Sequence, residues 1–341
     1  MPIAHKNSIR LKDVAELADV NMMTVSRVIN QPSKVAEATR DRVLAAIKKT
    51  GYVPNLMAGS LASNKSRIIG CIVPTIDNSI FAETVHGLTE SLAQSGYQLL
   101  LGQSNYDAVI EDQLVATFLG RKVDGLVLTG GEHSAITTKR LKLAKLPVVE
   151  TWDLPKKPID MVAGFSNYAA GEAVGKYLLT QGHKLICFAG SEDTRSSARL
   201  AGLQAACAKL IFSKKAGTPV AIRLAAGASF AGGRKVIADL AQATLPSAIF
   251  FGNDALAAGA LMECLARGIK VPEQLAIIGF ADLDIAANLE PALSTVRVLK
   301  RQMGQVAAGM LLAKLSATRP TRKLSARVQD LGFELVLRKS A

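Results

Sequence analysis

Three short amphipathic segments follow one another within the first fifty residues, and their spacing strongly limits the possible folds. Apolar side chains recur three and four positions apart over residues 11–18, 22–30 and about 37–50, the period of a helix with one buried face. Only residues 19–21 separate the first two segments, and Asn21 is a suitable N-cap for the second helix. The sequence therefore predicts a small three-helix domain with a tight turn between its first two helices.

The same period predicts which side chains of this domain face inward. The expected inner residues are Val14, Leu17, Ala18, Val25, Val28, Ile29, Val43, Leu44 and Ile47. Thr24, Ser26 and Arg27 then lie on the outside of the second helix, and Gly51 is placed to end the third. An exposed polar helix that follows a tight turn is typical of a segment that enters a groove of DNA.

Positive charge is concentrated in the same part of the chain. Residues 1–67 contain 11 Lys and Arg against 5 Asp and Glu, which is a net charge of +6 out of +13 for all 341 residues. A basic surface attracts the phosphates of a nucleic acid, although many basic surfaces bind only solvent and counterions. Charge and helix pattern together therefore predict a DNA-binding head more strongly than charge alone.

Composition argues against several other classes of protein. No run of about 18 uncharged apolar residues occurs, and residues 1–10 lack the apolar stretch of a secretory signal. We therefore expect a cytoplasmic, nucleoid-associated protein with no membrane partner. Four widely spaced cysteines form no metal-ligand pattern with the histidines, so we expect reduced, buried thiols and neither metal nor cofactor. These cysteines are Cys71, Cys187, Cys207 and Cys264.

From residue 67 onward, apolar strands alternate with amphipathic helices. The expected strands cover residues 68–73, 98–101, 125–128, 148–150, 161–164, 185–189, 220–224, 248–251 and 275–279. The expected helices cover residues 81–95, 110–121, 169–181, 197–209, 232–242, 254–267 and 299–315. Repeated strand–helix units predict a doubly wound α/β domain, whose ligands bind at the carboxyl ends of the parallel strands.

The N-terminal motifs match a known family in order and spacing. They are Asp13-Val-Ala-x-x-Ala18, Thr24-Val-Ser-Arg-Val28-x-Asn30, Gly51-Tyr-x-Pro-Asn55 and Ala58-x-x-Leu61-Ala62. Together they resemble the DNA-binding headpiece of the lactose/galactose repressor (LacI/GalR) family. The resemblance implies a helix-turn-helix headpiece over residues 1–54, followed by a hinge helix and linker over residues 55–66.

Further motifs extend the resemblance over nearly the whole chain. They are Leu178-x-x-x-Gly182-His183, Arg199-Leu-Ala-Gly202, Asn253-Asp254, Gly279-Phe280 and Pro291-Ala-Leu-Ser-Thr295. They imply an effector-binding and dimerisation domain over residues 67–341 that is similar to the periplasmic sugar-binding proteins. Its N-subdomain is expected over about 67–165 and 297–325, and its C-subdomain over about 166–296 and 326–341. Within the family, Glu150-Thr-Trp-Asp153 and Gly164-Phe-Ser166 are similar to the gluconate-repressor branch.

The resemblance also implies which residues contact DNA. They are Met22, Met23, Thr24, Ser26, Arg27, Asn30, Lys34, Tyr52, Asn55, Ala58 and Leu61. Met22 and Met23 occupy the family's base-reading positions, where their side chains would offer apolar contacts, for example with thymine methyl groups. Leu61 would wedge into the minor groove from a hinge helix that is too short to be stable alone.

A second implied set of residues surrounds the effector. It comprises Asn78, Phe81, Thr129, Trp152, Phe165, Arg199, Asn253, Asp254 and Asp282. Arg199 stands at an expected helix start after a strand, where the helix dipole and the guanidinium both favour an anion. Asn253 and Asp254 suit a plain helix N-cap equally well, and a lone Trp152 suits a core position as well as a ligand platform.

Two departures from the family pattern bear on the identity of the effector. Ala281 stands where relatives usually have an acidic residue, and the region around Gly227 lacks the aromatic residue that many relatives stack against a sugar ring. Because this chain lacks that carboxylate but keeps Arg199, the expected pocket favours an anionic effector. The hypothesis is therefore a sugar acid such as gluconate or its phosphorylated form, with a neutral sugar or a nucleoside as the alternative.

These inferences lead to one expected function. The chain should be a transcriptional regulator, most simply a repressor, that binds a near-palindromic operator as a homodimer and changes its affinity when the effector fills the cleft. A solute-binding protein for transport would need a secretion signal and no headpiece. An enzyme is not expected, because neither a Gly-x-Gly-x-x-Gly loop nor a Gly-x-x-x-x-Gly-Lys-Ser/Thr loop occurs and no catalytic set of residues stands out.

Overall fold

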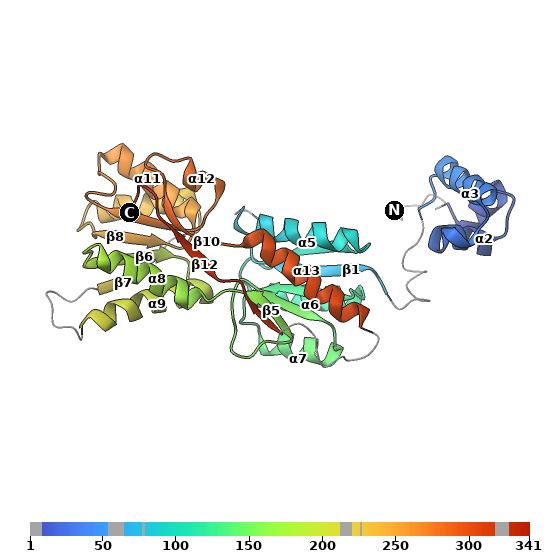
Figure 1. Cartoon of the computed structure of the whole chain (residues 1–341), viewed down its shortest axis with the longest axis horizontal. Helices are drawn as coiled ribbons and strands as arrows, with labels where there is room; N and C mark the ends of the chain where they lie inside the picture. Colours follow the sequence, from blue (N-terminus) through green and yellow to red (C-terminus); the bar gives the residue numbers. More distant parts are fainter. Residues whose placement is uncertain (1–8, 54–64, 77–78, 212–219, 226, 318–326) are drawn as a thin grey trace, which may run out of the picture. The chain divides into compact units, whose positions relative to one another are not determined.

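The computed structural model of this protein describes residues 9–53, 65–76, 79–211, 220–225, 227–317 and 327–341. The chain divides into two compact units, Met1–Ser66 and Arg67–Ala341. The described part of the first unit is helical, and the second contains two sheets covered by helices (Figure 1). The expected α/β fold with an all-α N-terminal headpiece is confirmed.

The first unit contains a helix-turn-helix arrangement. Its elements are α1 (Leu11–Leu17), α2 (Met22–Asn30), the 3₁₀ helix η1 (Pro32–Lys34) and α3 (Glu37–Thr50). Asn21 caps α2 as predicted, since its side-chain oxygen accepts the Thr24 N–H at 2.7 Å. Gly51 ends α3 with a φ of +67°, a left-handed conformation that glycine adopts without steric cost.

The core of this unit differs in detail from the predicted inner face. Leu17 and Leu44 are 45% and 50% exposed, so their predicted burial was wrong. Ala15 and Ala46 are buried instead, each with 4% exposure. In so small a bundle the helices approach closely, and small side chains fill the space beside the buried valines. The fully enclosed positions are Val14, Ala15, Ala18, Val25, Val28, Val43 and Ala46.

The N-terminus of α3 lacks a side-chain cap, which leads to a stability prediction. Ala36 is the exposed N-cap residue and cannot accept a hydrogen bond from the free N–H groups of the first turn. We expect Ala36→Ser to raise the free energy of unfolding of the headpiece by about 1 kcal/mol, because the serine oxygen would satisfy one of these groups. Thermal melting followed by circular dichroism measures the effect, and an unchanged or lower melting temperature would contradict this helix start.

The first sheet of the second unit is parallel. Its strands, in spatial order, are β11 (Val328–Asp330), β5 (Met161–Gly164), β4 (Val148–Thr151), β3 (Gly125–Thr129), β1 (Ile68–Val73) and β2 (Gln98–Gln103). The elements that accompany it are η2 (Ser79–Phe81), α5 (Ala82–Gln94), α6 (Ala108–Gly120), α7 (Ala135–Ala144) and α13 (Lys300–Ser316). Helix α13 packs beside α5, although the two are far apart in the sequence (Figure 1).

The second sheet repeats this plan, with one antiparallel edge. Its strands, in spatial order, are β12 (Phe333–Val336), β10 (Ser294–Val298), β9 (Ala276–Ala281), β8 (Ala248–Phe251), β6 (Leu185–Gly190) and β7 (Val220–Ala225). Its helices are α8 (Asn167–Thr180), α9 (Thr194–Ile211), α10 (Phe230–Leu240), α11 (Asp254–Arg267) and α12 (Asp284–Ala287). β12 runs antiparallel to β10, and the other strands pair in parallel.

The chain passes between the two sheets three times, and one of these crossings differs from the predicted boundary. The crossings lie between β5 and α8, between β10 and α13, and between β11 and β12. Residues 326–341 were expected in the C-subdomain. However, β11 pairs with β5 of the first sheet, with Val328 opposite Val162. The last crossing therefore follows Asp330, because the first sheet gains an additional edge strand.

A continuous apolar core connects both sheets of the second unit. It includes Phe81 and Trp152 from the first sheet's side and Phe188, Phe250 and Phe280 from the second. All four cysteines are buried and unpaired, and burial raises the pKa of the Cys71 thiol to about 12. Among the described helices, none is both long and apolar enough to cross a membrane.

Candidate DNA-binding face and effector cavity

Helix α2 presents the residues that the sequence analysis placed against DNA. Met22 and Met23, in its first turn, are 53% and 64% exposed, an unusual state for such apolar side chains. Arg27 is exposed one turn later, and its Nη2 lies 3.7 Å from the Met23 sulfur. Thr24 is half-buried, and both its N–H and its hydroxyl donate to Asn21. The outward face of α2 therefore presents the apolar side chains of Met22 and Met23 beside the positive charge of Arg27.

The remaining predicted DNA contacts are less completely defined by the structure. Lys34 ends η1 and is exposed, whereas Tyr52 is half-buried against the headpiece core. Asn30 is the last residue of α2, and its side chain lies outside what the structure describes. Three hinge positions lie outside the described residues altogether: Asn55, Ala58 and Leu61.

A cavity lies between the two sheets of the second unit, where several strands end. It contains about 460 Å³ of space free of atoms, including its mouth. Four of its lining residues come from the side of the first sheet: Ile80, Phe81, Tyr106 and Trp152. The others belong to the second sheet and its helices: Gly190, Ser191, Asp193, Arg195, Ser196, Arg199, Ala228, Gly252, Asn253, Leu256 and Phe280. The sequence predicted four of these residues, namely Phe81, Trp152, Arg199 and Asn253.

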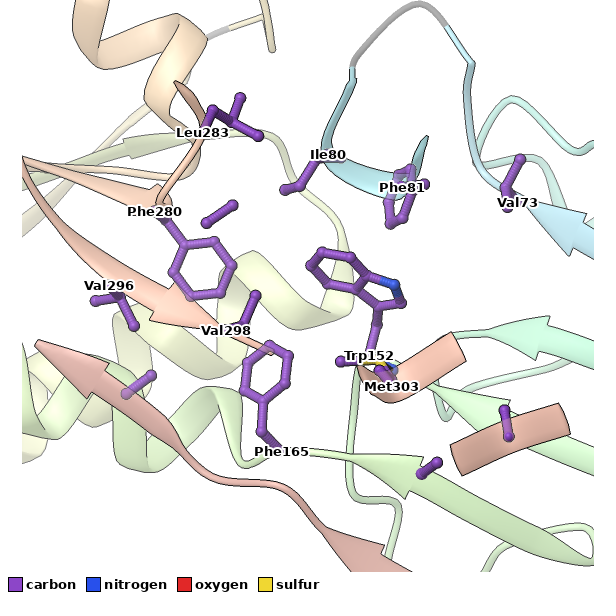
Figure 2. Packing of buried hydrophobic residues seen from close by; sticks show 14 of the residues in the cluster. Val73, Ile80, Phe81, Trp152, Phe165, Phe280, Leu283, Val296, Val298 and Met303 are labelled. Carbon is purple, nitrogen blue, oxygen red and sulfur yellow. Dashed lines mark hydrogen bonds between the residues drawn. The ribbon is translucent and has the colours of Figure 1, made fainter. Parts of the chain in front are cut away.

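An aromatic cluster forms one wall of this cavity. Figure 2 shows the Trp152 ring close to Phe81, Phe165 and Phe280. Its ring centroid lies 5.0 Å from that of Phe81 and 6.1 Å from that of Phe165, both at steep angles. The indole N–H donates to the Thr84 hydroxyl at 3.2 Å. Trp152 is therefore both a core residue and part of the cavity wall, and its contact with a ligand stays a prediction.

Arg199 is buried beside the cavity, against Phe280 of the same aromatic cluster. Its Nη1 donates to Asn167 Oδ1 at 2.6 Å, and its Nη2 donates to the Ser196 hydroxyl at 3.1 Å and the Gly252 carbonyl at 3.4 Å. The guanidinium lies 4.1 Å from the Phe280 ring centroid. Burial lowers the pKa of Arg199 to about 10, so the side chain still carries its charge at neutral pH.

Asp193 and Arg195 precede Arg199 at the start of α9. The Asp193 carboxylate accepts the backbone N–H groups of Arg195 and Ser196 and the hydroxyls of Ser191 and Ser196. Burial alone would raise the pKa of Asp193. The charges of Arg195 and Arg199, together with these hydrogen bonds, nevertheless hold it well below its usual range. Both oxygens of the Asp193 carboxylate thus accept hydrogen bonds from the protein. The carboxylate caps α9, and its charge stabilises the two arginines.

Two predicted effector residues do not line the cavity and have protein partners instead. Asp254 is fully buried, and its oxygens accept the Thr295 hydroxyl and the Leu283 N–H, each at 2.6 Å. Burial raises its pKa to about 6 against these hydrogen bonds. Asp282 binds Arg297 Nε at 2.7 Å and Arg338 Nη2 at 2.8 Å. Both carboxylates are hydrogen-bonded to residues of the second sheet and the segments beside it, and their role at the effector remains a prediction.

Other predicted positions also lie outside the cavity lining. Thr129 ends β3 without reaching the cavity, and Phe165 is fully buried behind Trp152. Asn78 lies outside the described residues. Conversely, the cavity includes Arg195 and Tyr106, which the sequence analysis missed. Arg195 lies four residues before Arg199, one helical turn away, and that spacing could have indicated it.

These features together define a class of protein. A helix-turn-helix unit with an exposed helix is joined in one chain to a two-sheet α/β unit with a buried, charged cavity. Such a combination is that of a ligand-responsive, DNA-binding transcriptional regulator.

Known proteins identify the family. Residues 10–55 match the family described as bacterial regulatory proteins, lacI family, and residues 176–341 match the periplasmic binding protein-like domain. The HTH-type transcriptional regulator GntR of Escherichia coli K12 is 33% identical and covers 95% of this chain and 96% of its own. The ribose operon repressor of the same strain is 32% identical, with 91% and 94% covered. The chain belongs to the lacI family and is a DNA-binding transcriptional regulator, not an enzyme.

A solved structure extends the match to three dimensions. A LacI-family transcriptional regulator from Silicibacter pomeroyi aligns with a TM-score of 0.88 at 30% identity, covering 97% of this chain and 99% of that one. The lac repressor, which is 24% identical, aligns with a TM-score of 0.81 in a structure of its dimer bound to operator and the anti-inducer ONPF. The roles of individual residues in this chain follow from its own geometry.

Proposed function

We propose that this chain is a repressor of sugar-acid catabolic genes, with operator affinity controlled by a sugar acid such as gluconate in the cavity of the second unit. In this proposal the headpiece covers residues 1–54, the hinge residues 55–66 and the effector domain residues 67–341. The exposed face of α2 reads the operator through Met22 and Met23, and Arg27 contacts the phosphate backbone.

The observation that carries the sugar-acid proposal is the charge of the cavity. Two buried arginines line it, and among the described residues Arg195 Nη1 and Arg199 Nε have no hydrogen-bond partner. Buried N–H groups of a cation are costly to leave unpaired, so they favour an anionic ligand. Asp193 is the only described carboxylate in the lining, and protein donors already surround it.

The proposed operator-binding species is a homodimer. β2 is an edge strand of the first sheet, and apolar side chains are exposed on it and on the helix that follows, including Leu101 at 42% and Val109 at 62%. A second copy would cover such an edge and place two headpieces on the two halves of a near-palindromic operator.

Operator binding in the presence of candidate effectors tests the whole proposal. Duplexes bound by the full chain are first selected from a random library, and the Kd of the best one is then measured with gluconate, 6-phosphogluconate, glucose and ribose. We expect a sugar acid to change the operator Kd by about 10-fold or more, and the neutral sugars by less than about 2-fold. A response only to a neutral sugar or a nucleoside would overturn the sugar-acid assignment.

Arg27→Ala supplies an internal control for that experiment. We expect it to weaken operator binding by about 10-fold, because a charged contact to DNA is lost, while calorimetric binding of the effector to the second unit stays unchanged. A variant that loses effector binding as well would indicate that the substitution had disturbed more than the DNA-reading face.

A second candidate effector, a neutral sugar, is favoured by one observation. Trp152 and Phe81 form an aromatic wall of the cavity, and Asn253 offers a polar side chain beside it. The ribose operon repressor of Escherichia coli K12, whose name refers to a neutral sugar, is 32% identical to this chain. The operator Kd measured with ribose and with glucose tests this alternative directly.

A further inference from the structure

We infer that Arg195 is the residue through which this chain distinguishes an anionic effector from a neutral one, in addition to any contact that Arg199 makes. The inference rests on the proposed sugar-acid effector, and it concerns the first of two arginines that lie one helical turn apart on α9. It makes Arg195 the specificity-determining side chain.

Most of the hydrogen-bonding groups of Arg199 are engaged by the protein. Its two terminal nitrogens already donate to Asn167, Ser196 and Gly252. Only Nε remains without a partner among the described residues, so Arg199 keeps a single N–H for a ligand. Arg199 therefore fixes Asn167 and Ser196 around the cavity.

Arg195 is held differently. Its side chain is 9% exposed and lines the cavity, and its Nη1 has no hydrogen-bond partner in the described part of the chain. Its Nε lies 3.6 Å from Asp193 Oδ1, so the carboxylate holds the inner edge of the guanidinium. The end of the guanidinium away from Nε therefore retains a donor for a ligand carboxylate.

Aromatic rings from the other side of the cavity flank the Arg195 guanidinium. Its central carbon lies 5.4 Å from the Phe81 ring centroid and 5.8 Å from that of Tyr106. Both rings belong to segments of the first sheet, whereas Arg195 belongs to the second. The rings orient the guanidinium and exclude water around it, which strengthens its attraction for an anion.

The local charge balance supports the same assignment. Among the residues that line the cavity, the charged side chains are Asp193, Arg195 and Arg199, with a net charge of +1, whereas Asp153, whose charge also acts on Arg199, does not line it. Asp282, the nearest acidic residue to the family's usual acidic position, is already bound by Arg297 and Arg338 and does not line the cavity. An effector carboxylate would thus balance the excess of positive charge on the side chains that line the cavity.

A pair of ligands that differ only in charge tests the inference. Gluconate and gluconamide share the same hydroxyl chain, but only gluconate carries a carboxylate. Their Kd values are measured by calorimetry on the full chain, on Arg195→Met, on Arg195→Lys and on Arg234→Met. The last is the matched control, because Arg234 is 52% exposed and its partner Glu263 keeps Arg267.

We expect the wild type to prefer gluconate over gluconamide by 10- to 100-fold, which is the effect of one charge-assisted hydrogen-bonded contact. Arg195→Met should reduce this preference to less than about 3-fold, and Arg195→Lys should retain part of it. Arg234→Met should behave as the wild type. Equal melting temperatures of wild type and Arg195→Met without ligand show that the cavity remains folded.

The outcomes separate this inference from the proposed function. If the wild type binds gluconate but Arg195→Met keeps the full preference for it, the assignment of Arg195 is overturned and the sugar-acid proposal stands. If the wild type binds neither gluconate nor 6-phosphogluconate, the proposed function itself fails. A folded Arg195→Met that binds both ligands equally supports the inference.

Discussion

Replacing Gly171 by alanine is expected to destabilise the second unit by about 3 kcal/mol and to abolish effector binding. Helices α8 and α9 pack so closely that an ideal Cβ on Gly171 would lie 1.8 Å from the Arg199 carbonyl oxygen. Backbone atoms cannot yield as a flexible side chain can, so the two helices must separate and carry Arg199 away from the cavity. Urea unfolding and calorimetric titration with gluconate measure the two effects.

Gly309 provides the matched control for this prediction. It is an exposed glycine within α13, and a Cβ built on it meets no atom within 4 Å. Because alanine is the better helix former, Gly309→Ala should raise the free energy of unfolding by about 1 kcal/mol. The same chemical change thus has opposite expected signs at two helical positions. Equal effects at both positions would contradict the close contact between α8 and α9.

The features that could be predicted from the sequence depend on nearby residues. Asn21 caps α2 through a residue three positions away, and Gly51 ends α3 through its own backbone conformation. Helix and strand periods depend on neighbours along one element, and they identified most of the parallel strands. Arg199 and Asn253 were found because each lies shortly after a strand end, where α/β units collect ligand-binding residues.

The environments that the sequence did not indicate depend on residues distant along the chain. Asp254 and Asp282 are acidic residues at strand ends, which is where a ligand-binding carboxylate is expected. The structure instead pairs Asp254 with Thr295, and Asp282 with Arg297 and Arg338. Those partners are 15 to 56 residues away from Asp282 and 41 residues away from Asp254. A single sequence gives no indication that such groups will meet.

Segments without a clear period were also missed. Helix α7 contains three residues of Lys and Arg and two threonines in ten, so its apolar stripe is reduced to a few positions. The edge strands β11 and β12 are only three and four residues long, too short for alternation to be recognised. Both edge strands depend on pairing with distant strands, β5 and β10, for their conformation.

A buried pair of acidic and basic groups next to β4 should make the stability of the second unit depend on pH. Glu150 is 1% exposed, and its Oε2 accepts the Ile159 N–H at 2.7 Å. His133 Nδ1 lies 2.8 Å from Glu111 Oε1, and its Nε2 lies 3.7 Å from Glu150 Oε1. Burial raises the pKa of Glu150 from 4.5 to about 7, despite the hydrogen bond from Ile159 and the charge of His133.

The direction of the pH dependence follows from these pKa shifts. Burial would lower the pKa of His133, but Glu111 and Glu150 raise it overall. Both groups therefore hold protons more tightly in the folded protein than in the unfolded chain. Their stabilising contribution is complete below the unfolded pKa of Glu150, near 4.5, and is lost as the pH rises through about 7. The expected loss for Glu150 alone is about 3 kcal/mol between pH 4.5 and pH 8.

Glu150→Gln isolates this contribution, because glutamine stays neutral at every pH and its carbonyl can still accept the Ile159 N–H. We expect the variant to be more stable than the wild type at pH 8 by up to about 3 kcal/mol and nearly equal to it at pH 5, as measured by urea unfolding at four pH values. Glu290→Gln, the same change on a side chain that is 81% exposed, is the control. If Glu150→Gln had the same free energy of unfolding as the wild type at every pH, other interactions would have to offset the cost of burying the ionised carboxylate. That result would establish a charged Glu150–His133 pair in place of a neutral Glu150. His133 Nε2 lies near Glu150 and lacks a hydrogen-bond partner among the described residues.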